Sequence, residues 1–180
     1  VESSQGLLAL VEKPTADTSA MFGGNGLAVV LDRIQDPGNA GTMLRSAEAF
    51  GASGCVFLTG SVSADAPKLL RASAGSRFRL PVLEGLNASE FLALARERGV
   101  GLYAAEPSAT SLLGGIAWEF PAALIVGNEG SGVDSALLRH ARGFRIPTRG
   151  VESLNAGVSA AIALYEMGRE AVWQPKERVR

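Results

Sequence analysis

The feature that most constrains this chain is the alternation of short apolar, β-rich runs with segments of helical periodicity. The run LAVVLD at 27–32 has no polar residue before its last position, as expected for a strand buried on both faces of a sheet. The following segment, 40–51, places Ala40, Met43 and Ala47 at helical spacing. This alternation predicts an α/β fold with a mostly parallel sheet covered by helices on both faces.

The same patterning continues along the chain after residues 1–26, which have the character of a tail or linker. The predicted strands are 27–32, 54–59, 78–83, 100–106, 122–127 and 143–147. The predicted helices are 40–51, 65–75, 88–99, 134–142 and about 155–172. Pro81 favours an edge position for the third strand, because proline donates no hydrogen bond to a neighbouring strand.

The composition supports a large buried apolar area. Of the 180 residues, 47% are hydrophobic and 19% charged, below the usual charged share of about 25%. We therefore expect one domain, with its apolar surplus inside a covered sheet or at a subunit interface.

Several classes of protein are excluded or disfavoured. No apolar run reaches about 18 residues, so we expect no membrane span, and the N-terminus lacks the pattern of a signal peptide. One Cys, Cys55, and one His, His140, make a zinc site unexpected and fit a reducing, cytoplasmic setting. We expect no metal, a core position for Cys55 and a surface position for His140.

The charge is balanced overall but locally uneven. The net charge of −1 is not typical of a nucleic-acid-binding domain, whose pI is usually above about 9. Two segments nevertheless contain basic residues and no acid. They are 68–79, with Lys68, Arg71, Arg77 and Arg79, and 139–149, with Arg139, Arg142, Arg145 and Arg149. A local basic surface is therefore expected.

Because ligands of parallel α/β sheets bind outside the carboxyl ends of the strands, the segments after the strands are the candidate sites. The first is DPGNAGTMLRS, where Asn39 is a candidate cap for the next helix and Arg45 lies on its polar flank. The alternative is a solvated helix face on which Arg45 pairs with Glu48.

A second polar segment, ALIVGNEGSGV, follows the strand at 122–127. Gly127, Gly130 and Gly132 surround Asn128 and Glu129, and glycines permit close approach of a ligand to the backbone. The pattern is neither a dinucleotide-binding fingerprint nor a P-loop. A simple turn is the alternative to a site.

A third polar segment, RIPTRGVESLN, leads into the last helix. Ser153 and Asn155 both lie where a helix cap is expected, and only one of them can fill that role. The other is left available for a ligand. Which of the two is the cap stays open from the sequence.

Together the three segments resemble, in order and spacing, the motifs of the SpoU (TrmH-type) family of SPOUT RNA ribose 2′-O-methyltransferases. The resemblance covers about residues 27–170, on DPGNAGTMLRSAEAFGASG, LIVGNEGSGV and IPTRGVESLNAGVSAAIALYE. It implies a C-terminal trefoil knot, S-adenosyl-L-methionine (AdoMet) as cofactor, and a homodimer packed through the region of the last helix. It also implies RNA, either tRNA or rRNA, as the substrate.

The resemblance extends to domain organisation. SSQGLLALVEKP is similar to the linker that joins such a domain to an N-terminal RNA-binding domain. We therefore expect 1–26 to be a linker from a missing RNA-binding domain and 27–180 to be the SPOUT methyltransferase domain. The absent initiator Met fits the same expectation.

The family motifs also assign roles to residues of this chain. Arg45 is implied to bind a substrate phosphate and stabilise the developing alkoxide, because arginine almost never deprotonates. Whether Arg45 or the phosphate takes the proton stays open. The other implied catalytic residues are Asn39, Glu129, Ser153 and Asn155, and the implied cofactor-binding residues are Gly127, Ile146, Leu154, Ala104, Ala105, Glu106, Asn128, Gly132 and Pro147.

Two other functions compete with ribose methylation. A SPOUT enzyme of the same fold can methylate a base, and the fold can also persist as a non-catalytic RNA- or nucleotide-binding module. The motif SLNAGVSAA favours ribose, and the presence of every implied catalytic residue argues against lost activity.

Overall fold

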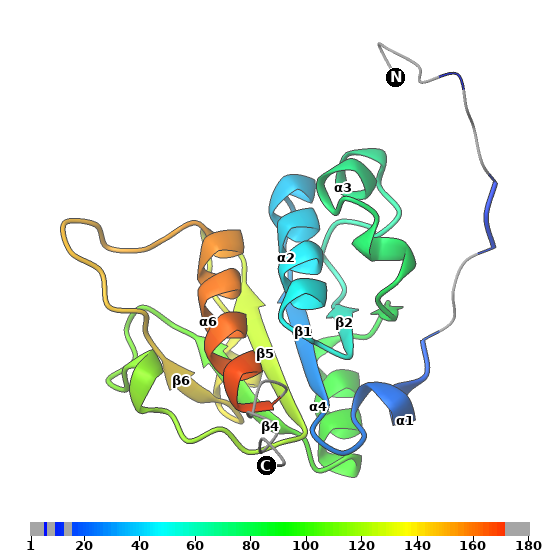
Figure 1. Cartoon of the computed structure of the whole chain (residues 1–180). Coiled ribbons are helices and arrows are strands. Elements are labelled where there is room, and N and C mark those ends of the chain that lie inside the picture. Colours follow the sequence, from blue (N-terminus) through cyan, green and yellow to red (C-terminus); the bar gives the residue numbers. More distant parts are fainter. Residues whose placement is uncertain (1–5, 7–9, 13–15, 172–180) are drawn as a thin grey trace, which may run out of the picture.

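The computed structural model describes residues 6, 10–12 and 16–171 and shows one parallel sheet between two layers of helices (Figure 1). The sheet has six strands in the order β3-β2-β1-β5-β4-β6, and every pairing is parallel. The strands are β1 Leu27–Asp32, β2 Gly54–Phe57, β3 Val82–Glu84, β4 Gly101–Ala105, β5 Ala122–Gly127 and β6 Arg142–Phe144. The predicted α/β class with a covered parallel sheet is confirmed; the trefoil knot stays a prediction.

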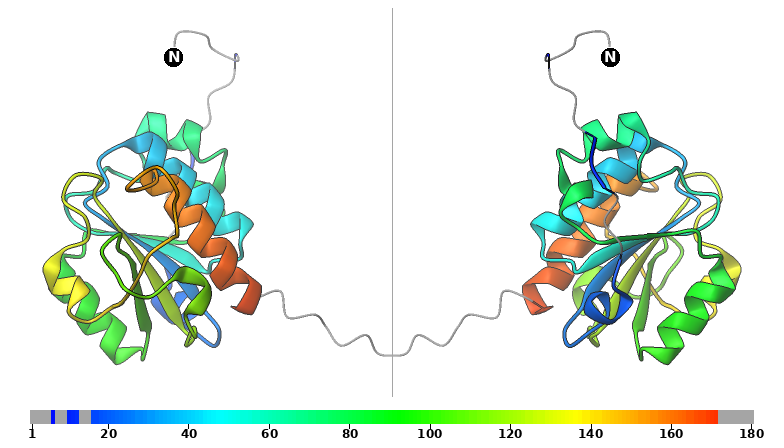
Figure 2. Two further views of the ribbon diagram at one scale, coloured as in Figure 1. Left: turned by 90° about the vertical axis from the view of Figure 1, so that its left-hand side faces the viewer. Right: turned by 90° about the vertical axis from the view of Figure 1, so that its right-hand side faces the viewer.

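Helices cover both faces of the sheet, as the two side views in Figure 2 show. One face carries α2 Pro37–Ala49, α3 Pro67–Ala72 and α6 Ala156–Ala171. The other carries α1 Thr18–Met21, α4 Ala88–Glu97 and α5 Ser135–Leu138. Short 3-10 turns, η1 Ser76–Phe78 and η2 Leu113–Gly115, lie in the connections.

The continuous apolar run of β1 follows from this layering. Leu27, Val29 and Leu31 pack with α2 and α6, while Ala28 and Val30 pack on the opposite face with α4 and α5. Alternate side chains of a strand point to opposite faces, so a strand covered twice needs apolar residues at every position. Cys55 in β2 is fully buried, as predicted, and burial raises the pKa of its thiol.

Element boundaries differ from the predicted ones mainly at helix ends. The helix α2 begins at Pro37 instead of residue 40, and α3 and α5 are shorter than expected. The predicted edge position of the third strand is confirmed, but β3 begins after Pro81, whereas the predicted strand 78–83 included it, and Phe78 belongs to η1. Shorter helices arise because their ends are set by caps and contacts that hydrophobic periodicity does not encode.

The segment before β1 contains an element that periodicity did not predict. Met21, in α1, is fully buried and Phe22 is only 4% exposed, and both pack against the face that carries α4. Residues 17–22 therefore belong to the folded body. The prediction that 1–26 links this body to a further RNA-binding domain stays a prediction, and much of 1–15 lies outside the described residues.

The helices α2 and α6 lie side by side on one face (Figure 1), in close contact through small residues. A Cβ at Gly168 would lie 2.5 Å from the carbonyl oxygen of Phe50, and one at Gly157 would lie 3.3 Å from Thr42 Cγ2. This close approach brings the beginnings of the two helices together at the carboxyl edge of the sheet. Among the described residues, no helix combines the length and hydropathy that crossing a membrane requires.

Candidate functional site

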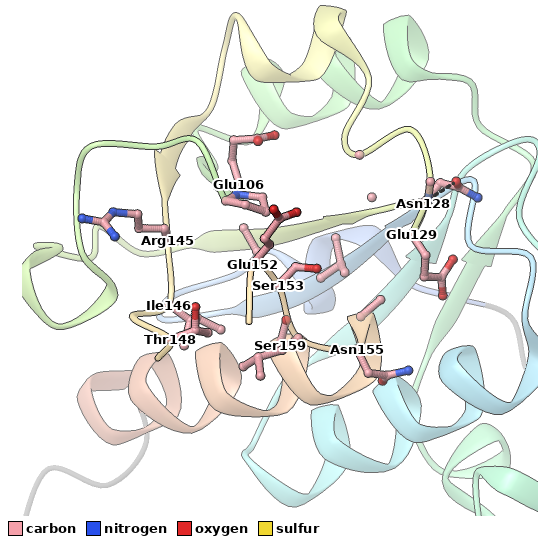
Figure 3. A pocket seen from close by; sticks show the side chains of 18 of the residues that line it. Glu106, Asn128, Glu129, Arg145, Ile146, Thr148, Glu152, Ser153, Asn155 and Ser159 are labelled. Carbon is pink, nitrogen blue, oxygen red and sulfur yellow. Dashed lines mark hydrogen bonds between the residues drawn. The ribbon is translucent and has the colours of Figure 1, made fainter. Parts of the chain in front are cut away.

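A cavity of about 620 Å³ lies at the carboxyl ends of β4, β5 and β6 (Figure 3). Its walls are formed by residues 105–107, 126–132, 144–146, 148, 152–156 and 159. The second and third polar segments of the sequence line it directly, and the first contributes from the start of α2. The carboxyl edge predicted from the sheet topology is therefore where the structure gathers these residues.

The start of α2 corrects the expected cap. Asp36, not Asn39, caps the helix: its Oδ1 accepts a hydrogen bond of 2.7 Å from the backbone N–H of Asn39. This bond, with the nearby charge of Lys68, lowers the pKa of the Asp36 carboxyl. Because Pro37 occupies the first turn, the helix begins earlier than expected, and the side chain of Asn39 is left free to make contacts elsewhere.

A chain of side-chain hydrogen bonds joins the three polar segments. Asn39 Nδ2 donates to Glu129 Oε1 at 2.5 Å, and Asn155 Nδ2 donates to Asn39 Oδ1 at 3.0 Å. These residues are 90 and 116 positions apart in sequence from Asn39. Each amide uses its donor and acceptor in a defined direction, so the chain of bonds sets the orientation of both asparagines.

The same geometry settles which residue caps α6. Asn155 Oδ1 accepts hydrogen bonds from the backbone N–H groups of Gly157 at 2.9 Å and Val158 at 3.2 Å. Asn155 is thus the cap, and Ser153 is exposed and lines the cavity. Asn155 has two roles: its side-chain oxygen caps the helix, and its amide nitrogen contacts Asn39.

The loop after β5 folds back on itself so closely that its first residue must be glycine. A Cβ at Gly127 would lie 2.3 Å from both Gly132 C and Val133 N, far inside contact distance. Asn128 Oδ1 accepts from the N–H groups of Gly130 and Ser131, and Gly132 has a φ of +67°. We name residues 127–132 the glycine loop; the Asn128 side chain shapes this loop and points away from the middle of the cavity (Figure 3).

Ten of the predicted site residues line the cavity. They are Glu129, Ser153, Asn155, Gly127, Ile146, Leu154, Ala105, Glu106, Asn128 and Gly132. Asn39 is bonded to two of them. Ala104 is fully buried with its side chain on the opposite face of the sheet, and Pro147 and Arg45 are exposed outside the lining. The roles of all these residues stay predictions.

Arg45 is exposed on α2, and its side chain makes no hydrogen bond or ion pair with any residue that the structure describes. The alternative pair with Glu48 is wrong, because Glu48 is bound by Arg79 through bonds of 2.5 and 2.9 Å. This pairing lowers the pKa of Glu48 to about 2. The Arg45 guanidinium is therefore available to an external anion.

The cavity carries more acidic than basic side chains. Glu106, Glu129 and Glu152 line it, against one lining arginine, Arg145, whose side chain points outwards from its centre (Figure 3). Carboxylates aimed into a cavity favour a ligand with positive charge. No group of three or more His, Cys, Asp or Glu suited to a metal ion occurs among the described residues.

The sequence did not predict two further groups of residues that line or support the cavity. Thr148, Glu152 and Ser159 line the cavity from a loop and a helix start, where no periodicity marks them. At the end of β1, Arg33 binds the carbonyl of Gly132 in the glycine loop, and Asp32 binds the backbone N–H of Asp134 just after the loop. The one signal in the sequence was the acidic residue ending an otherwise apolar strand.

Comparisons with known proteins bear on the same segments. Residues 26–165 match the model of the SpoU rRNA Methylase family. The chain is 40% identical over 146 residues to the 23S rRNA (guanosine(2553)-2′-O)-methyltransferase RlmP of Bacillus subtilis, covering 77% of this chain and 56% of RlmP.

The chain also superposes on solved structures of methyltransferases. An AdoMet-bound rRNA methyltransferase from Sinorhizobium meliloti superposes with a TM-score of 0.82 at 31% identity, over 88% of this chain and 62% of the other. The SpoU methyltransferase AviRb from Streptomyces viridochromogenes, in complex with AdoMet, gives 0.81 at 29% identity, over 87% and 65%. The chain thus spans little more than half the length of such relatives.

Proposed function

The chain belongs to the SpoU rRNA Methylase family, and from this premise we propose that it transfers the methyl group of AdoMet to a ribose 2′-hydroxyl of structured RNA. The observation that carries the proposal is the hydrogen-bonded chain Glu129–Asn39–Asn155 beside the cavity. It joins three segments distant in sequence into one polar rim. Such a rim has no evident structural purpose at the open edge of a sheet.

The cavity fits AdoMet in size and charge. Its volume of about 620 Å³ lies within the usual range of cofactor sites, about 300–1,000 Å³. Val126, Ile146 and Leu154 provide apolar lining suited to a nucleoside, and the carboxylates of Glu106 and Glu152 suit a cationic ligand. On this basis we propose that the cofactor-binding residues predicted from the family motifs hold AdoMet, with Ala104 and Pro147, which lie outside the lining, acting through the backbone.

The bound cofactor supplies an electrophilic methyl group on a sulfonium. For the ribose oxygen to accept this methyl group, the hydroxyl would have to be oriented towards it and its proton would have to pass to an acceptor. The chain's residues orient the hydroxyl and stabilise the negative charge that develops on it. Asn39 and Asn155 are held in fixed orientation for this task, with Ser153 and Glu129 beside them.

Arg45 would hold the phosphate next to the reacting ribose. Its guanidinium is exposed and engages no described residue, so binding a phosphate breaks no existing pair. An arginine stays charged at neutral pH and is a poor base, so we assign the proton to a substrate phosphate oxygen.

The substrate would be tRNA or rRNA in the cytoplasm. Arg139, Arg145 and Arg149 are exposed, have no partner among the described residues and lie in the segment that leads to the cavity. Phosphate contacts from such residues supply most of the sequence-independent affinity for nucleic acid.

We also propose that two copies pack through α6. Val158 is 46% and Tyr165 43% exposed, and they share one side of the helix with the half-buried Ala161 and Ile162. An exposed apolar stripe of this kind marks an interaction surface. In Ile162→Glu/Tyr165→Glu, sedimentation should show a monomer where the unaltered chain is a dimer.

The central test is methyl transfer from labelled AdoMet to separated tRNA and rRNA, followed by nucleoside analysis. Arg45→Ala should abolish ribose methylation while calorimetry still detects AdoMet binding. Arg71→Ala, which removes another exposed arginine without a partner among the described residues, is the matched control. Retained turnover in Arg45→Ala would remove Arg45 from the mechanism.

A second variant separates cofactor from substrate. Gly127→Val should lose AdoMet first, because its side chain would collide with the backbone of residues 132 and 133. Gly114→Val is the control, since a Cβ there meets nothing within 4 Å. A methylated base in the product would favour base methylation. Absence of both AdoMet binding and methyl transfer in the unaltered protein would favour the non-catalytic module.

A further inference from the structure

The glycine loop is attached to the end of β1 by a cluster of bonds that do not enter the cavity. Asp32, the last residue of β1, is 3% exposed and lies beside Gly127 in the strand register. Its carboxylate accepts from Arg33 Nε and Nη2, both at 3.0 Å, and from the backbone N–H of Asp134 at 2.7 Å. One buried acid thus lies beside the first residue of the loop and binds the second residue after it.

Arg33 adds two further connections. Its Nη2 also donates to the carbonyl of Gly132 at 3.2 Å, and its own carbonyl accepts from Asn128 Nδ2 at 3.0 Å. Both ends of the glycine loop are therefore held by a single residue, 95 and 99 positions earlier in the chain. The bidentate bond to Asp32 raises the pKa of the Arg33 guanidinium.

The backbone of Arg33 is itself unusual. Its φ of +57° lies in the left-handed region, which costs energy for a residue other than glycine. That conformation turns the carbonyl toward Asn128 while the side chain returns to Asp32 and Gly132. Glycine would adopt this backbone more easily, so the side chain's bonds are what an arginine provides here.

Within the described part of the chain, the loop's other hydrogen bonds are mostly internal. Asn128 binds Gly130 and Ser131 through its side chain and Gly132 through its carbonyl, and Glu129 binds Asn39. Internal bonds give the loop its shape but do not orient it on the sheet. Orientation depends on the bonds from Asp32 and Arg33 at the base of the loop and on the bond between Glu129 and Asn39; neither Asp32 nor Arg33 lines the cavity.

We propose that Asp32 and Arg33 are positioning residues that clamp the glycine loop in the orientation required to bind the cofactor. This inference rests on the proposed function for the identity of the ligand, AdoMet. The side-chain hydrogen bonds that join this pair to the cavity wall run to the carbonyl of Gly132 and from the side chain of Asn128. The effect of the pair is therefore on cofactor affinity, through preorganisation of the loop.

The test compares Asp32→Asn with a control that breaks another bidentate pair. Asparagine keeps the volume of Asp32 and loses the charge that binds Arg33. Glu48→Gln likewise removes the charge that binds Arg79. Glu48 lies on α2 and does not line the cavity. Calorimetry should show AdoMet affinity weakened about tenfold in Asp32→Asn, the scale of one charge-assisted bond lost, and within about twofold of normal in Glu48→Gln.

Two readouts distinguish positioning from a general loss of stability. The KM for AdoMet should rise more than kcat falls. Hydrogen exchange should accelerate at the amides of Gly130, Ser131, Gly132 and Asp134 while the amides of β1 and β5 keep their protection. Unchanged affinity together with unchanged loop exchange would overturn the clamp.

A second substitution covers the case in which Asp32→Asn does not fold. Arg33→Gly removes the clamping side chain while relieving the left-handed strain, and admits water to the Asp32 carboxylate. It should weaken AdoMet binding to a similar extent, and Arg33→Lys should lie between it and the unaltered protein. If the unaltered protein does not bind AdoMet, the proposed function fails, while loop exchange in Arg33→Gly still decides whether the clamp exists.

Discussion

The two basic segments of this chain are alike in sequence but differ in pairing: among the described residues, three of four basic side chains are paired in 68–79, where Arg71 is the exception, and one of four in 139–149. In 68–79, Lys68 lies 3.7 Å from Asp36, Arg77 contacts Asp65 and Arg79 contacts Glu48. In 139–149, only Arg142 is paired, with Glu119 at 2.8 Å, and it also lies 5.9 Å from the ring centre of Tyr103. Arg139, Arg145 and Arg149 have no partner among the described residues.

This difference shows that a run of basic residues is not by itself a basic surface. Each acid that neutralises 68–79 is supplied by a segment outside it, from the start of α2, the end of α2 or the loop before α3. In 139–149, by contrast, Arg145 lines the cavity, and the side chains of Arg139 and Arg149 are also unpaired among the described residues. The first segment stabilises the fold, and we infer that the second is free to contact RNA.

The largest expected effect is on stability, from Arg77→Ala. The Arg77 side chain is 1% exposed and its Nε donates to Asp65 at 3.1 Å. Removing this buried side chain leaves a cavity in the fold, so the free energy of unfolding should fall by about 3 kcal/mol. Urea denaturation measures this, with Arg71→Ala as control. A loss below about 1 kcal/mol would contradict a structural role for this arginine.

The next largest effect is expected on RNA affinity, from substitutions in the segment 139–149. Arg145→Ala/Arg149→Ala should weaken RNA binding about tenfold and make its salt dependence shallower by about one unit per arginine. Filter binding across salt concentrations measures both. Arg79→Ala, which removes an arginine already paired with Glu48, should leave the salt slope unchanged. Equal salt dependence of RNA binding in the two variants would show that the two segments do not differ in their contact with RNA.

A smaller effect depends on pH. Because pairing with Arg79 lowers the pKa of Glu48 from 4.5 to about 2, this carboxylate stabilises the folded state fully above pH 4.5. That contribution is lost as the pH falls towards 2. The Tm of Glu48→Gln should lie a few degrees at most below normal at pH 7, and the difference should shrink between pH 4.5 and 2. A difference that grows on acidification would show that the sign is wrong.

The smallest effect is expected at Lys68. Its ammonium and the Asp36 carboxylate are 65% and 47% exposed, and such pairs contribute little. Lys68→Ala should leave the Tm unchanged in calorimetric scans. Asp36→Ala should lower it, since Asp36 also caps α2. Equal losses from both would mean that the ion pair, and not the cap, is what matters.

The fold class could be predicted from the sequence because the pattern is local. Every residue of β1 is apolar up to Asp32, which is enough to place it in a sheet covered on both faces. The carboxyl edge and half of the cavity-lining residues followed from the general rule for such sheets and from the family motifs. The helix α1 was missed, since four residues are too few to show a period.

What the sequence by itself determined was therefore the α/β class, the family and the neighbourhood of the site. Only the tertiary structure decided that Asp36 caps α2, that Asn155 caps α6 while binding Asn39, and that Asp32 and Arg33 hold the glycine loop. The reason is the separation along the sequence over which each kind of interaction acts. Periodicity and turn chemistry act over a few neighbouring residues, whereas these hydrogen bonds and ion pairs depend on which distant segments the sheet brings together.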